Sequence, residues 1–223
     1  MENRRTFIKK TAIGTAGVSM GLTAVSAKSY GRILGANDRI NMGVIGLRGR
    51  GKGLMEGFSR MYGEGVYIKT VCDVDSEYHE SSRELVAENQ EGNKPDAVQD
   101  LRKVFEDPEI DAVAMATPNH WHALGTIWAC QAGKHVYVEK PSSHNIWEGR
   151  KMVEAARKYN KLVQVGFQNR SISNVMQAMN FLHKGGIGDV FMARGTCFKP
   201  RDSFGISPDS EAPSTLDYDI WLG

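Results

Sequence analysis

The residue best placed for chemistry is Lys140, which follows a short apolar run. Residues 135–138 are rich in β-branched and aromatic side chains and predict a buried strand, and Glu139-Lys140-Pro141 comes directly after them. Because a residue before proline favours an extended backbone, Lys140 is held in a defined turn. An ammonium in that position can polarise a substrate oxygen and help to move a proton. The alternative is an ordinary solvated surface lysine.

Three other predicted strands also end in polar or glycine-rich residues. They are 43–46, which runs into Leu47-Arg48-Gly49-Arg50-Gly51, 66–72, which runs into Asp73, and 111–117, which runs into Pro118-Asn119-His120-Trp121-His122. In an open parallel sheet, ligands bind beyond the carboxyl ends of the strands. We therefore expect these residues and Lys140 to share one rim of one sheet.

The glycine-rich segment has most of the features of a dinucleotide-binding turn. Such a turn gives the backbone room to approach a pyrophosphate and aims a helix N-terminus at its charge. Residues 46–51 match the G-x-G-x-x-G pattern except at the middle glycine, where Arg48 stands. A glycine turn before a helix is common in proteins without a cofactor, so the motif alone is a weak signal.

Asp73, at the end of the next predicted strand, strengthens the dinucleotide interpretation. A carboxylate there can accept hydrogen bonds from ribose hydroxyls and repels a 2′-phosphate. The alternative is an aspartate that caps a helix or a turn. We predict NAD as the cofactor, and NADP stays open because Arg48 and Arg50 could offset the repulsion.

No metal site and no disulfide framework is predicted. His120 and His122 form an H-x-H pair without other clustered ligands, and such a pair is more often the first turn of a helix. Cys72, Cys130 and Cys197 lack C-x-x-C spacing and lie in predicted strands or helices. We expect all three to be buried free thiols.

Composition and the N-terminus indicate an exported globular protein. The 223 residues carry a formal net charge of +2 and are 41% hydrophobic, so no nucleic-acid partner is indicated. Arg4 and Arg5 form a twin-arginine pattern, followed by an uncharged segment that ends in Val25-Ser26-Ala27. This predicts a Tat signal peptide at 1–27, a linker at 28–38 and a periplasmic location. The segment is too short and polar for stable membrane insertion; the alternative is an ordinary basic N-terminus followed by a helix.

Strands and helices alternate from residue 39 to residue 166. Strands are predicted at 39–46, 66–72, 111–117, 135–139 and 162–166, and a loop or short strand at 94–97. Helices are predicted at 49–61, 76–89, 98–105 and 122–132. A further helix begins at the capping-box pair Asn145 and Glu148 and ends at 160. This order predicts an α/β fold, a doubly wound Rossmann-type parallel sheet. Residues 167–223 follow with a helix at 174–183, a strand at 189–197 and a loop at 199–223, which predict the start of an incomplete second α/β domain.

Taken together, these segments resemble the glucose–fructose oxidoreductase/inositol dehydrogenase (Gfo/Idh/MocA) family. The resemblance covers roughly residues 39–223, and the joint pattern is specific although no single motif is. It is carried by residues 43–51, Val71-Cys72-Asp73-Val74-Asp75, Ala116-Thr117-Pro118-Asn119-His120-Trp121-His122, residues 133–141, Val165-Gly166-Phe167-Gln168-Asn169-Arg170 and Leu216-Asp217-Tyr218-Asp219-Ile220-Trp221-Leu222-Gly223.

The resemblance implies NAD(P)-linked oxidation or reduction of a sugar or polyol carbon, with Lys140 as the catalytic residue. The implied cofactor-binding residues are Gly46, Gly49 and Gly51 at the pyrophosphate, Asp73 at the adenosine ribose, Thr117, Pro118, Asn119 and His122 on the nicotinamide side, and Glu139 and Lys140 at the nicotinamide ribose. Arg48, Arg50, Pro141 and Gln168 are counted with them, and Gln168 and Asn169 would also lie near the substrate.

The resemblance further implies about one more domain, by the usual domain size, which supplies the substrate pocket and the D-x-x-x-H-type acid/base residues. We therefore expect this chain to be the N-terminal part of an enzyme, homo-oligomeric when full length. Two alternatives stay open. One is a glycosidase that uses bound NAD for transient oxidation of the sugar, and the other is a non-catalytic NAD-binding fragment.

Overall fold

The computed structural model describes residues 39–197, 200–203 and 205–223. The predicted Tat signal and linker, residues 1–38, lie outside the described residues. Within the described ranges, no helix has both the length and the apolar character needed to cross a bilayer.

In the described part of the chain, six parallel strands form one sheet. They are β1 (Ile40–Ile45), β2 (Val66–Cys72), β3 (Asp96–Val98), β4 (Ala112–Met115), β5 (His135–Glu139) and β6 (Val163–Gly166). Their order in the sheet is β3-β2-β1-β4-β5-β6, the order of the doubly wound dinucleotide-binding fold. The predicted fold class is therefore confirmed, and the strand order reverses between β1 and β4.

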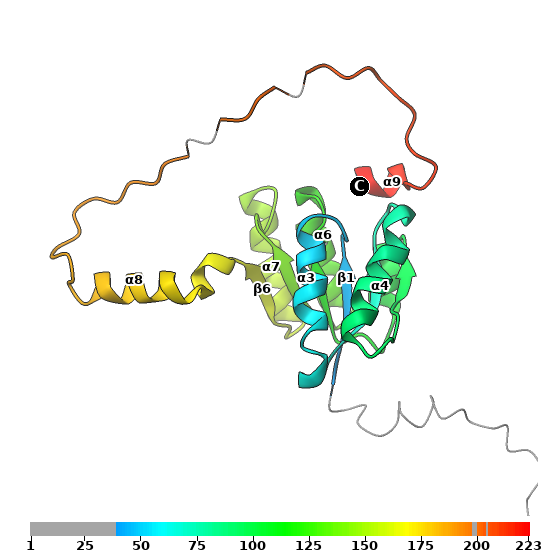
Figure 1. The fold of residues 1–223 in the computed structure, drawn as a ribbon, viewed down its shortest axis with the longest axis horizontal. Helices are drawn as coiled ribbons and strands as arrows, with labels where there is room; N and C mark the ends of the chain where they lie inside the picture. Colours follow the sequence, from blue (N-terminus) through cyan, green and yellow to red (C-terminus); the bar gives the residue numbers. More distant parts are fainter. Residues whose placement is uncertain (1–38, 198–199, 204) are drawn as a thin grey trace, which may run out of the picture. The chain divides into compact units, whose positions relative to one another are not determined.

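Helices cover both faces of this sheet (Figure 1). On one face lie α3 (Arg50–Ser59) and α4 (His79–Asn89), and on the other α5 (Leu101–Glu106), α6 (Asn119–Gln131) and α7 (Ile146–Lys158). The chain continues through α8 (Ser173–His183) to α9 (Tyr218–Leu222), with short 3-10 turns η1 (Tyr62–Glu64), η2 (Ser76–Tyr78) and η3 (Gln168–Ser171).

The alternation of side chains along each strand builds two apolar cores, one on each face. In β4, Val113 and Met115 pack in the core under α5, α6 and α7, whereas Ala114 packs in the core under α3 and α4. Because both faces are covered, the strands are mainly apolar, and β4 (AVAM) is apolar throughout, which is why most of them are visible as short runs in the sequence.

The caps of two helices show how local sequence sets their boundaries. The amide of Glu148 donates to Asn145 Oδ1 at 2.9 Å, and the Glu148 carboxylate accepts from the amide of His144 at 3.0 Å, so Asn145 caps α7 as predicted. Helix α6 begins at Asn119, directly after Pro118, earlier than the predicted residue 122.

Three predictions for the later chain and its cysteines are wrong. Residues 189–197 form no strand, because no described strand lies beside them to accept and donate the necessary hydrogen bonds. Cys197 lies in this irregular segment and is exposed, whereas Cys72 and Cys130 are buried as expected.

The predicted loop at 199–223 contains α9, which begins where Asp217 Oδ1 accepts from the amide of Ile220 at 3.1 Å. Assignment of 167–223 to a second domain stays a prediction.

Candidate functional site

A glycine turn joins β1 to α3 at the carboxyl edge of the sheet. Gly46 has φ +84° and Gly49 φ +46°, conformations that favour glycine. A Cβ on Gly46 would lie 2.7 Å from the Ala116 carbonyl oxygen, and one on Gly51 would lie 1.7 Å from the Gly46 oxygen. The two glycines therefore let α3 start close against β1 and β4, the switch point of the sheet.

The N-terminus of α3 is open to an anion. No side chain caps it, and no acidic residue lies in its first turn. A Cβ on Gly49 would meet nothing within 4 Å. The Gly51 amide donates to the Arg48 carbonyl at 2.8 Å. The other amides of the first turn and the positive end of the helix dipole are the groups that a bound pyrophosphate would meet.

Asp73 connects the end of β2 to this glycine turn. Its Oδ2 accepts a hydrogen bond from the Leu47 amide at 2.8 Å, and its Oδ1 accepts one from the Asp75 amide at 3.0 Å. Asp73 therefore caps a turn, which is the alternative role that the sequence left open. Each carboxylate oxygen keeps a further lone pair, so the same group can also accept from a ligand hydroxyl.

The two arginines of the turn face different partners. The Arg48 guanidinium lies 4.5 Å from the centre of the Tyr78 ring and lines a cavity beside Asp73. Arg50 instead donates through Nε to the Glu139 carboxylate at 2.7 Å. Only Arg48 is therefore placed to influence a ligand at Asp73.

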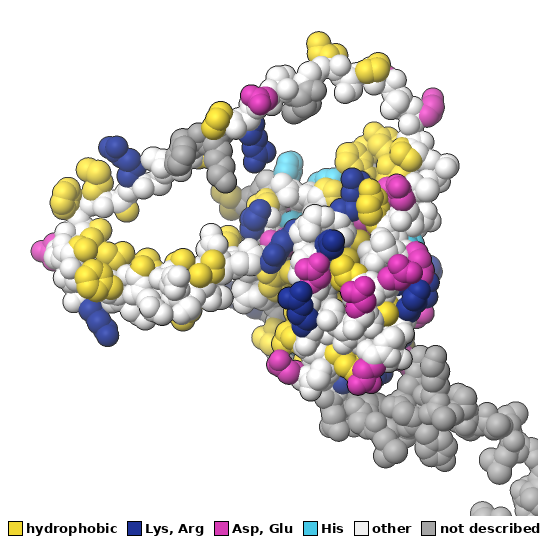
Figure 2. Space-filling view, viewed as in Figure 1, with side chains coloured by type: hydrophobic (Ala, Val, Ile, Leu, Met, Phe, Trp, Pro, Cys, Tyr) yellow, Lys and Arg dark blue, Asp and Glu magenta, His cyan; other side chains and the backbone are white. Residues whose placement is uncertain are grey.

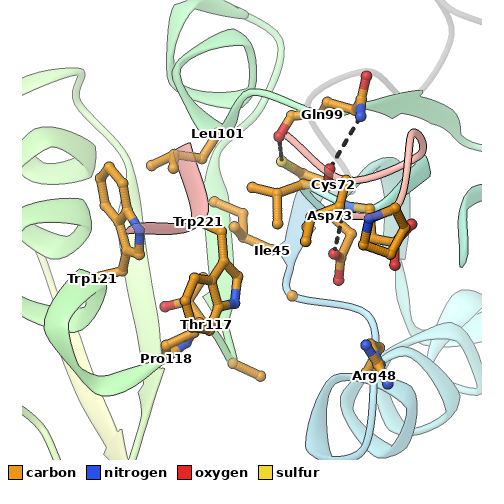
Figure 3. Close-up of a pocket in the computed structure, with 16 residues that line it drawn as sticks. Ile45, Arg48, Cys72, Asp73, Gln99, Leu101, Thr117, Pro118, Trp121 and Trp221 are labelled. Atoms are coloured by element: carbon orange, nitrogen blue, oxygen red, sulfur yellow. Dashed lines mark hydrogen bonds between the residues drawn. The ribbon is translucent and has the colours of Figure 1, made fainter. Parts of the chain in front are cut away.

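A cavity of about 380 Å³ opens beyond the ends of β1, β2 and β4 (Figure 3). Arg48 and Asp73 lie on one side of it, and Thr117, Pro118 and Trp121 lie on the other. The Thr117 hydroxyl is buried and has no hydrogen-bond partner among the residues described. Such an orphaned group at a cavity fits a ligand that supplies the missing hydrogen bond.

Cys72 also lines this cavity. Burial raises the pKa of its thiol well above the ordinary value, with smaller contributions from Asp73 and Asp100. The thiol donates to the Gln99 carbonyl with a sulfur–oxygen distance of 3.6 Å. It is therefore a neutral packing group and not a nucleophile.

A buried acid, Glu139, organises the end of β5. Besides Arg50, its Oε1 accepts from the Tyr137 hydroxyl at 3.3 Å and from the Gln168 side chain, and Gln168 Nε2 also donates to Tyr137 at 3.0 Å. The hydrogen bond to Glu139 is the main reason that the pKa of Arg50 is raised. Tyr137 was missed in the sequence analysis, although its spacing of two residues from Glu139 places both on one face of the strand.

Gly166 leaves room for this cluster, which gives a testable consequence. A Cβ at Gly166 would lie 2.6 Å from the Tyr137 hydroxyl and 2.8 Å from Glu139 Oε1. We expect Gly166→Ala to break the cluster and to lower the free energy of unfolding by about 1–3 kcal/mol, measured by urea denaturation. Gly63→Ala is the control, since a Cβ there meets nothing within 4 Å. Equal stability losses in both variants would contradict the assigned role of Gly166.

His122 contacts two predicted site segments, the one that follows β4 and the one that follows β5. The side chain is 1% exposed, with Nδ1 2.5 Å from the Pro141 carbonyl oxygen and Nε2 2.9 Å from the Thr117 carbonyl oxygen. Both partners are carbonyl oxygens, and which ring nitrogen donates depends on the tautomer. His122 therefore fixes backbone near the cavity and near Lys140, and its side chain is not free to contact a ligand.

The other predicted site residues lie at the same edge of the sheet. Pro118 and Asn119 are exposed at the start of α6, and Lys140 is exposed just after β5. The Lys140 amide donates to Glu139 Oε2 at 3.3 Å, so the backbone at Lys140 is attached to the buried acid. Gln168 is the first residue of η3 and belongs to the Glu139 cluster. Among the described residues, no three His, Cys, Asp or Glu side chains gather as a metal site.

The sequence profile of the Gfo/Idh/MocA family matches residues 40–167, more than half of the chain. The profile describes an oxidoreductase family with an NAD-binding Rossmann fold. This chain belongs to the Gfo/Idh/MocA family. The match covers the sheet, the glycine turn and the β5 end, so this part is an NAD-binding Rossmann domain of an oxidoreductase family. The resemblance seen in the sequence is confirmed.

Among curated Gfo/Idh/MocA relatives, levoglucosan dehydrogenase of Pseudarthrobacter phenanthrenivorans is 38% identical over 97 residues, 44% of this chain and 25% of that protein. A glycosyl hydrolase family 109 protein of Shewanella pealeana is 26% identical over 204 residues, 84% of this chain and 44% of that protein. The chain thus spans less than half of the length of these relatives.

Solved structures show the same fold. An NAD-binding oxidoreductase from Klebsiella pneumoniae has a TM-score of 0.56 and 27% identity, covering 67% of this chain and 40% of that one. Scyllo-inositol dehydrogenase from Lactobacillus casei, with bound NAD(H) and scyllo-inositol, has a TM-score of 0.58 and 23% identity, covering 68% of this chain and 43% of that one. At that identity, the second likeness supports the fold alone.

Proposed function

We propose that this chain binds NAD(H) at the carboxyl edge of its sheet and serves an oxidoreductase that acts on a sugar or polyol carbon. The observation that carries the proposal is the uncapped N-terminus of α3, which opens beside the cavity at Asp73. Together they offer an anion site and an adjoining pocket, the two things that a dinucleotide needs.

The proposed cofactor lies across the switch point between β1 and β4. Gly46, Gly49 and Gly51 let its pyrophosphate approach the amides of α3, and the cavity receives the adenosine. Asp73 accepts from the adenosine ribose through its remaining lone pairs and disfavours a 2′-phosphate, so NAD(H) is preferred over NADP(H). Arg48 is the one cation placed to weaken that preference among the residues lining this cavity.

The proposed reacting end lies toward Lys140. When bound, the nicotinamide supplies hydride transfer to or from a carbon. Lys140 would hold or move the proton of the substrate hydroxyl, since it is exposed on a turn whose backbone is hydrogen-bonded to Glu139 and, at the Pro141 carbonyl, to His122. Asn119 and Gln168 would border the nicotinamide.

A sugar or polyol substrate is supported by the likeness to levoglucosan dehydrogenase. The test is a panel of sugars, anhydrosugars and polyols given to the purified protein with NAD, and to the protein of the complete gene where that is longer. We expect NADH formation with a member of the panel. Binding of NAD(H) without turnover of any member by either protein would reject the oxidoreductase proposal and leave a binding module.

A second candidate is favoured by the family 109 relative of Shewanella pealeana, which matches 84% of this chain. In this alternative, bound NAD would supply a transient oxidation of the sugar during cleavage of the glycosidic bond, so no net NADH would form. Aryl glycosides distinguish the two candidates. Release of the aryl alcohol without NADH accumulation would favour the glycosidase, and NADH accumulation without bond cleavage would favour the dehydrogenase.

We also propose export through the Tat pathway, which carries folded proteins and thus suits a chain that loads NAD in the cytoplasm. Arg4→Lys with Arg5→Lys is expected to retain the protein in the cytoplasm of a Tat-competent bacterium, because the pathway recognises the arginine pair. Cell fractionation and immunoblotting measure this. A double variant that still reaches the periplasm would contradict the proposal.

A further inference from the structure

A segment from the end of the chain crosses the cavity beside Asp73. At one end of this segment, the Ser76 amide donates to the Thr215 carbonyl at 2.9 Å, and the Asp217 amide donates to the Val74 carbonyl at 2.9 Å. The Gln99 side chain also donates to the Thr215 carbonyl, at 3.0 Å. The segment is therefore attached to the chain that follows both β2 and β3.

The other end of the segment is attached to α6. The Trp121 indole donates to the Ile220 carbonyl at 3.0 Å, and His120 Nε2 lies 3.0 Å from the Trp221 carbonyl oxygen. Ile220 packs against the core under α5, α6 and α7. The segment thus spans from the end of β2 to the start of α6, over the gap where the cavity opens.

Side chains of this segment form part of the cavity wall. Pro213, Leu216 and Trp221 line it together with Asp73 and Arg48. Figure 3 shows the Trp221 indole on the side of Thr117 and Pro118, facing the side of Asp73. Trp221 is still 41% exposed, and hydrophobic side chains gather over α9 in Figure 2. The Tyr218 ring stacks on one face of the indole, with 5.7 Å between ring centroids, and the His120 ring lies edge-on to it at 6.4 Å. The exposed part of the indole at the cavity is therefore the part that an aromatic ligand could contact.

We propose that residues 213–222 are a strap that completes the adenosine end of the cofactor site, with Trp221 as the wall against which the adenine ring packs. This inference rests on the proposed function, since it takes NAD(H) as the ligand. Asp73 and Arg48 hold the ribose side opposite, so the adenosine sits between a polar and an apolar wall. A base on an aromatic side chain gains a stacking contact that needs no hydrogen-bond readout.

The test compares binding of NADH and ADP-ribose by titration calorimetry. Trp221→Ala is expected to weaken both ligands about 5- to 100-fold, and Trp221→Phe, which keeps an aromatic face, to weaken them much less. Leu222→Ala is the matched control, because Leu222 is exposed on the same helix and does not line the cavity. Equal affinities for wild type, Trp221→Ala and Leu222→Ala would overturn the strap.

Hydrogen exchange of the wild-type protein gives a second readout that needs no variant. Saturation with ADP-ribose is expected to slow exchange of the amides in residues 215–222 as well as in the glycine turn. Protection of the glycine turn alone would overturn the strap while leaving the cofactor site intact. Failure of the wild-type protein to bind NADH or ADP-ribose at all would instead reject the proposed function.

Discussion

Gly51→Ala is expected to weaken NADH binding by at least about 100-fold, equivalent to about 2.7 kcal/mol. A Cβ at Gly51 would lie 1.7 Å from the Gly46 carbonyl oxygen, which belongs to backbone and cannot turn aside as a flexible side chain would. The N-terminus of α3 must then move away from the glycine turn, and the amides that we assign to the pyrophosphate lose their direction. Titration of the variant with NADH, followed by nicotinamide fluorescence, measures the loss.

Gly57→Ala is the matched control, because Gly57 lies in the same helix and a Cβ there meets nothing within 4 Å. We expect its NADH affinity to equal that of the wild type and its stability to rise by up to about 1 kcal/mol, since alanine favours a helix interior. If Gly51→Ala folds and binds NADH as well as Gly57→Ala does, the glycine turn is not the pyrophosphate site.

Lys140→Ala is expected to lower kcat by about 10²–10³ while leaving NAD(H) affinity nearly unchanged. The lysine lies at the end of β5, whereas the pyrophosphate is assigned to the turn after β1. Its neighbour Glu139 already pairs with Arg50, so the Lys140 ammonium is left for the substrate. Steady-state kinetics with the substrate found in the panel, together with NADH titration, separates the two effects.

Lys140→Arg sharpens this experiment, because arginine keeps the positive charge but does not release a proton under ordinary conditions. If proton transfer is the role of Lys140, the arginine variant stays nearly as slow as the alanine variant. Recovery of most of kcat in Lys140→Arg would indicate electrostatic polarisation alone. A wild-type kcat in Lys140→Ala would remove the residue from the reaction.

The rim of the site could be predicted from sequence because of how parallel strands are buried. Because the strands are covered on both faces, they are mainly apolar, so the polar residues that follow a run indicate its carboxyl end. Asp73, Thr117 and Lys140 were located in this way, and the strand order then brings them to one edge. The glycine pattern at residues 46–51 also indicated where the helix after the first strand begins.

Long-range contacts could not be predicted in this way. Arg50 and Glu139 are far apart in the chain, and nothing in their spacing shows that they pair across the switch point. The contribution of Trp221 depends on a segment that returns to Trp121 after an irregular stretch. The strand predicted at 189–197 failed for a related reason: its apolar residues favour a strand, but a strand forms only where a partner strand lies beside it.

The most direct measurement of NAD(H) binding at this site is a titration of the purified wild-type protein with NADH and, separately, with NADPH. We expect saturable binding of one NADH per chain, displacement by ADP-ribose, and weaker binding of NADPH because Asp73 opposes a 2′-phosphate. Tighter binding of NADPH would contradict the role given to Asp73. Absence of saturable binding by either nucleotide would contradict the cofactor site itself.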